Sequence, residues 1–66
     1  MPNVMIDGPP VDIEKKRVLT KEITDVASRV YGLPPMAIVV VIRENPGENV
    51  SVGGCLICDR QPGGSD

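Results

Sequence analysis

Pro2 is the residue of this chain whose type and position could do chemistry, because it directly follows the initiator Met1. Proline in the second position normally permits removal of Met1, which would leave Pro2 with a free secondary amine; until then its nitrogen is an amide without a usable lone pair. Burial among apolar groups lowers the pKa of an amine toward neutrality, and a general base works best with a pKa near the operating pH. Pro2 is thus a candidate for a catalytic base that also returns the proton. The simpler alternative is that Pro2 merely begins an edge strand.

A base of this kind generates a negatively charged oxygen on its substrate, so the site also needs a cation or N–H donors aimed at that oxygen. The candidates are Lys15, Lys16, Arg43 and the backbone N–H groups around Gly53-Gly54. We expect Lys16 and Arg43 to contact the substrate. The alternatives are that lysines in the first turns of a helix are solvated, and that Arg43, at a strand end and followed by Glu44, belongs to a surface ion pair.

Cys55 and Cys58 have the C-x-x-C spacing of redox and zinc sites. Redox motifs lie at a helix N-terminus, whereas two glycines precede this pair. In a strand, the two side chains would point to opposite faces. Zinc would need further ligands, and the chain has two cysteines and no histidine, so two subunits would have to share an ion. We therefore expect the thiols to have a packing role, with no metal and no other cofactor.

The composition argues against several function classes. Seven Lys and Arg against nine Asp and Glu give a formal net charge of -2, and Tyr31 is the one aromatic residue, whereas nucleic-acid binding requires clustered cations and stacking rings. A small anionic substrate is compatible, because one or two cations suffice in a pocket. No run is long enough to cross a bilayer, and the N-terminus lacks a basic segment followed by a long apolar core. We expect a cytoplasmic protein, where free thiols persist.

A helix over residues 13–31 is the element with the clearest signals. Asp12 suits its N-cap, and apolar residues then recur at three- and four-residue spacing. Gly32 suits the left-handed position beyond its end, and Pro34-Pro35 cannot continue it. The pattern predicts an amphipathic helix with defined ends.

Strands are predicted on both sides of this helix. Residues 2–7 form a short apolar run without alternation, which predicts a strand buried on both faces, and residues 37–44 are dense in β-branched side chains, which predicts a central strand. This order predicts a βαβ unit with parallel strands and a right-handed crossover. Residues 50–58 predict a short hairpin and residues 61–66 a loose tail. The expected fold is α+β, one domain over residues 1–66.

Self-association is the expected source of further stability. A chain of this size buries only about 60% of its unfolded surface. Two parallel strands with one helix leave a sheet face and two edges open, although parallel sheets are normally covered. We predict a closed homo-oligomer whose sheets join edge to edge and stack face to face, with the hairpin reaching across a subunit boundary.

The order of these features carries a resemblance to a known family. Proline after the initiator Met, the helix sequence EKKRVLTKEITDVASRVYG, the strand VVVIRENP and the segment ENVSVGG together resemble the 4-oxalocrotonate tautomerase family over roughly residues 2–59. The resemblance implies small βαβ subunits assembled as hexamers, each a trimer of dimers. It also implies an isomerase that uses its N-terminal proline for keto–enol tautomerisation of small 2-oxo or 2-hydroxydienoate acids.

The chain departs from that family at three positions. Members resemble one another in two substrate-binding arginines and an aromatic residue that keeps the pocket apolar. At these positions this chain has Val11 or a neighbouring residue, Val39 and Val50. This departure leaves two other functions open. One is a catalytically vestigial oligomer with a structural or binding role, and the other is hydration or dehalogenation of an unsaturated acid.

Overall fold

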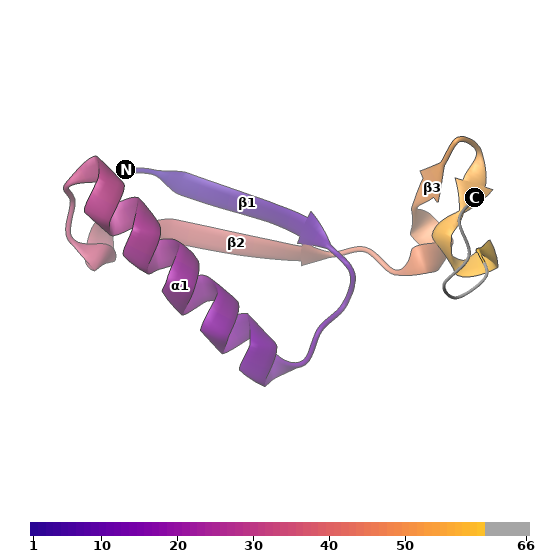
Figure 1. Ribbon diagram of the computed structural model, residues 1–66, viewed down its shortest axis with the longest axis horizontal. Coiled ribbons are helices and arrows are strands. Elements are labelled where there is room, and N and C mark those ends of the chain that lie inside the picture. Colours follow the sequence, from indigo (N-terminus) through magenta and orange to yellow (C-terminus); the bar gives the residue numbers. More distant parts are fainter. Residues whose placement is uncertain (61–66) are drawn as a thin grey trace.

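A computed structural model describes residues 1–60 of the chain, and the predicted tail at residues 61–66 lies outside the described residues. Strand β1 (Asn3–Gly8) is followed by helix α1 (Ile13–Tyr31) and strand β2 (Val39–Glu44). Helix α1 crosses one face of the two strands, and the chain begins at the end of the subunit where α1 finishes (Figure 1). The predicted α+β fold with a βαβ unit is confirmed.

Local signals set both ends of α1. The side chain of Asp12 accepts a hydrogen bond from the N–H of Lys15 at 2.8 Å, which caps the first turn. At the other end, Gly32 is left-handed with φ of 71°, and its N–H donates to the carbonyl of Ser28 at 2.9 Å. The helix therefore has the bounds that its sequence predicted.

The two strands are parallel neighbours, paired from Asn3 opposite Val39 to Gly8 opposite Glu44. Their bounds differ slightly from the prediction. The first strand starts and ends one residue later than residues 2–7. The second starts at Val39 because Pro35–Ala37 form a 3-10 turn, in which the N–H of Ile38 donates to the carbonyl of Pro35.

The prediction that the first strand is buried on both faces is wrong for a single chain. Val4 and Ile6 are half-buried, whereas Met5 between them is 53% exposed, because α1 covers only one face. On β2, Val41 is likewise 38% exposed. Among the described residues, only Ile38 is buried. The subunit alone thus has almost no core.

The C-terminal part forms the predicted hairpin. Strands β3 (Ser51–Val52) and β4 (Cys55–Leu56) are antiparallel, and Gly53 and Gly54 turn the chain with φ of 61° and 86°. The hairpin stands away from the βαβ unit (Figure 1). The radius of gyration is 15.4 Å, against about 11 Å for a compact chain of this length. No helix among residues 1–60 is long and apolar enough to span a membrane.

Candidate functional site

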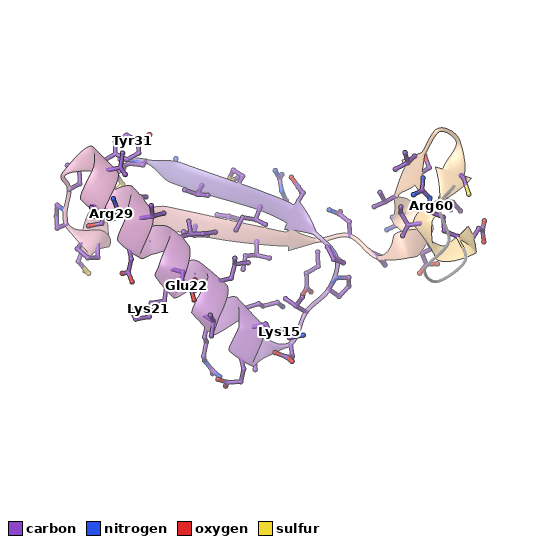
Figure 2. All side chains as sticks on the ribbon, in the orientation of Figure 1. Lys15, Lys21, Glu22, Arg29, Tyr31 and Arg60 are labelled. Atoms are coloured by element: carbon purple, nitrogen blue, oxygen red, sulfur yellow. The ribbon has the colours of Figure 1, made fainter. Side chains whose placement is uncertain are left out.

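Pro2 lies directly before β1 and is held by the backbone. Its carbonyl accepts a hydrogen bond from the N–H of Val39 at 3.1 Å, and its side chain is half-buried. Met1 is 83% exposed, so its removal would break little packing. Figure 2 shows Arg29 and Tyr31 in the last turn of α1, at the same end of the subunit, where the positive charge of Arg29 complements the helix dipole.

Arg43 is held by an ion pair at the opposite end of the strands. Its Nε lies 3.1 Å from Oδ1 of Asp7, and its Nη2 donates to Oδ2 of the same carboxylate at 3.3 Å. The two residues are register partners on β1 and β2, on the face away from α1. The surface ion pair that the sequence left as an alternative does form, with Asp7 as its partner.

Lys16 is also paired, and its partner is Glu44. The Nζ of Lys16 lies 2.8 Å from Oε2 of Glu44, and the N–H of Val11 donates to the same oxygen at 3.1 Å. The hydrogen bonds from Lys16 and from Val11 lower the pKa of the Glu44 carboxyl below its ordinary value of 4.5. Glu44 therefore ties the loop before α1 to the end of β2. It was not a candidate from the sequence, since the link joins residues far apart in the chain.

A single chain does not bring Pro2 together with these cations. Pro2 precedes the first register pair, Asn3 opposite Val39, whereas Asp7 and Arg43 pair four residues further on. Four strand residues span about 13 Å. Lys16 and Arg43 are linked to the same end of the two strands through their partners, Glu44 and Asp7.

A hollow of about 370 Å³ lies beyond the ends of β1 and β2. Its walls are mostly apolar and include Val50 and Ile57 from the hairpin segment and Pro9 from the loop after β1. Asp7 is the ionisable residue that lines it. Val50, at the position of the expected aromatic residue, thus lies in a hollow with the volume of a small-molecule pocket.

The remaining candidates are placed elsewhere. Lys15 is on the exposed first turn of α1 (Figure 2), and Gly53-Gly54 form the hairpin tip. Cys55 ends up in β4 and Cys58 in the 3-10 turn Ile57–Asp59, both with free, exposed thiols. The expected packing role is therefore not visible within one chain. The two cysteines do not share a strand, because β4 ends before Cys58, so their side chains do not point to opposite faces of one strand. No cluster of three or more His, Cys, Asp or Glu residues that could hold a metal occurs within residues 1–60.

The sequence of residues 2–60 matches the family model described as Tautomerase enzyme, which covers Pro2, both strands, α1 and the hairpin. The chain belongs to the tautomerase family. No curated protein matches this family member, so its solved relatives provide the comparison.

Three solved structures share the fold of this family member. DmpI from Archaeoglobus fulgidus is 45% identical, with a TM-score of 0.83 over 88% of this chain and 100% of that one. A 4-oxalocrotonate tautomerase homologue is 28% identical, with a TM-score of 0.84 over 94% and 100% of the two chains. DmpI from Helicobacter pylori is 26% identical, with a TM-score of 0.77 over 86% and 97%. The predicted family is confirmed.

Proposed function

We propose that this tautomerase-family protein is an isomerase that interconverts the keto and enol forms of a small 2-oxo acid or 2-hydroxydienoate, with Pro2 as the base. The observation that supports it most directly is a proline that follows a highly exposed Met1 and is fixed at the start of β1 by the N–H of Val39. Membership of a family described as tautomerase enzymes gives the reaction class.

The proposed reaction is a proton transfer with no other reactant. The secondary amine of Pro2 takes the proton from the enol oxygen or from the carbon next to the carbonyl, and the electron pair moves into the dienolate. The ammonium of Pro2 then returns the proton to the other end of that system. Because the bonds lost and gained are both to hydrogen, no cofactor is needed. Lys16 and Arg43 are proposed to bind the substrate carboxylate or the developing oxyanion.

We further propose that each site combines Pro2 of one subunit with the Arg43 end of another. A twofold axis that sets two subunits antiparallel brings the start of one β1 toward the end of the other subunit's strands. The exposed faces at Met5 and Val41 and the near-absence of a core support such an assembly. We propose a homo-hexamer built as a trimer of dimers, in the cytoplasm.

The test is the Pro2→Ala variant, compared with wild type after mass spectrometry has confirmed removal of Met1 in both. Turnover of phenylpyruvate and 2-hydroxymuconate should fall by about 100-fold or more. Pro10→Ala is the matched control, since Pro10 is an exposed loop residue outside the site, and it should keep wild-type rates.

Rates equal to the uncatalysed background in both Pro2→Ala and wild type would favour the second candidate, a vestigial oligomer that binds without turning over a substrate. One observation favours that candidate. Both cations expected to contact the substrate are already matched to carboxylates, Lys16 to Glu44 and Arg43 to Asp7.

A further inference from the structure

At the end of the two strands, each of two cationic side chains is paired with one carboxylate. The carboxylate of Asp7 meets the guanidinium of Arg43 at two points, and the carboxylate of Glu44 meets the ammonium of Lys16. A substrate carboxylate that approaches Lys16 or Arg43 must therefore compete with the protein carboxylate that is already paired with that cation. A substrate with two carboxylates would find no uncompensated positive charge from these four side chains.

Two of the hollows formed by residues 1–60 differ in what they could bind. The hollow of about 370 Å³ has apolar walls, with Asp7 as its ionisable lining residue. The second hollow lies along the first turns of α1 and is lined by three carboxylates, those of Asp12, Glu14 and Glu22, against the single cation of Lys15. An anion is disfavoured in the second hollow, whereas the apolar walls of the first suit the apolar group of an acid.

We infer that the substrate is a 2-oxo monocarboxylic acid with an apolar aryl or alkenyl substituent, and not a dicarboxylate, and that Asp7 sets this specificity. The inference rests on the proposed function, in which Pro2 of a second subunit meets the Arg43 end of the strands, the end at which this hollow lies. Once Pro2 has taken the proton, its ammonium supplies one positive charge for one carboxylate. A second carboxylate would lose its hydration beside Asp7 without gaining a partner.

Asp7 is a specificity-determining residue in this inference because it both lines the hollow and occupies Arg43. In the variant Asp7→Asn, the hollow loses its negative charge and Arg43 is released for a second carboxylate. The ratio of kcat/KM for 2-hydroxymuconate to that for phenylpyruvate should rise about five- to tenfold. Asp25→Asn is the matched control, because Asp25 pairs with Lys21 on the exposed side of α1, and it should leave the ratio unchanged.

Binding gives a second measurement that does not depend on turnover. Calorimetry of the processed, assembled protein should show tighter binding of cinnamate, a monocarboxylate with an aryl group, than of muconate, a dicarboxylate. In Asp7→Asn the ratio of the Kd for muconate to the Kd for cinnamate should fall by the same five- to tenfold. In Asp25→Asn this ratio should equal that of wild type.

The outcomes separate the two proposals. Pro2-dependent turnover with 2-hydroxymuconate preferred, or muconate bound at least as tightly as cinnamate, would overturn the substrate inference and leave the tautomerase proposal standing. Loss of Pro2 dependence with cinnamate still preferred would remove the tautomerase proposal while the binding preference of the hollow stands. An unchanged ratio in Asp7→Asn would remove Asp7 from the specificity of the site.

Discussion

Arg43 and Asp7 face each other across the parallel strands and make two contacts, Nε to Oδ1 at 3.1 Å and Nη2 to Oδ2 at 3.3 Å. Two contacts fix the plane of the guanidinium as well as its position. A fixed guanidinium can be aimed at a substrate in a way that a mobile lysine cannot. Arg43 is therefore the stronger of the two proposed substrate-binding cations.

The variant Arg43→Ala tests this ranking. Removing a cation aimed at a developing oxyanion should lower kcat by about 100-fold. Lys16→Ala should have a smaller effect, since an ammonium is a point charge without the planar fork of a guanidinium. Steady-state kinetics with phenylpyruvate measure both, with Lys21→Ala on the outer side of α1 as the control. Wild-type kcat in Arg43→Ala would remove it from the mechanism.

An N-terminal extension should abolish activity without unfolding the protein. A Gly-Ser extension before Pro2 keeps the nitrogen of Pro2 in an amide, which has no basic lone pair. Met1 is exposed and makes no described contact that folding requires, so circular dichroism should be unchanged. The same extension with a protease site provides the control, because cleavage back to Pro2 should restore turnover.

Stability should depend on pH through Glu44. Its pKa is lowered in the folded chain by Lys16 and by the N–H of Val11, so its contribution is present above the ordinary value of 4.5 and is lost as pH falls below it. Thermal melts at pH 7 and pH 3.5, at one protein concentration, should show a smaller loss of Tm in Glu44→Gln than in wild type. Glu22→Gln should behave like wild type, and an identical loss in all three proteins would contradict the assignment.

Assembly should depend on the sheet face that α1 leaves open. The variant Met5→Lys places a charge on that face, where the wild-type side chain is 53% exposed in a single chain. In sedimentation experiments, the oligomer of this variant should begin to dissociate at a protein concentration at least tenfold higher than the wild-type oligomer does, because a buried unpaired charge is costly. Met36→Lys is the control, since Met36 is 91% exposed on the turn before β2. Equal dissociation of both variants would argue against this interface.

The end of α1 should be sensitive to a side chain at Gly32. The variant Gly32→Ala forces a Cβ into a left-handed residue with φ of 71° and should cost about 1 kcal/mol of unfolding free energy. Gly8→Ala is the control, because a Cβ at Gly8 meets no atom within 4 Å and Gly8 has no positive φ. Urea unfolding at equal protein concentrations gives both values.

The fold could be predicted where its signals are local. Asp12 and Gly32 act within one turn of the helix ends, and the β-branched run before Glu44 needs no distant partner to favour a strand. The prediction that the first strand is buried on both faces was wrong for a single chain, because an apolar run indicates burial in the complete assembly. The run does not indicate which molecule covers each face of the sheet. Within one subunit, α1 covers only one face.

The site was less predictable, because its geometry depends on strand register. Asp7 and Glu44 could not be assigned as the partners of Arg43 and Lys16 until the pairing of β1 with β2 was known. The catalytic role of Pro2 stays a prediction, which rests on its place after Met1 and on the family resemblance and does not depend on strand register.

The separation of Pro2 from Arg43 along the strands also has a genetic consequence. If each site draws these residues from different subunits, a Pro2→Ala subunit and an Arg43→Ala subunit, each inactive alone, would rebuild intact sites when co-assembled. Conversely, a defective allele would lower the output of a normal one in the same cell. Mixed oligomers would therefore show both complementation and partial dominance, although each subunit carries a single N-terminal proline amine.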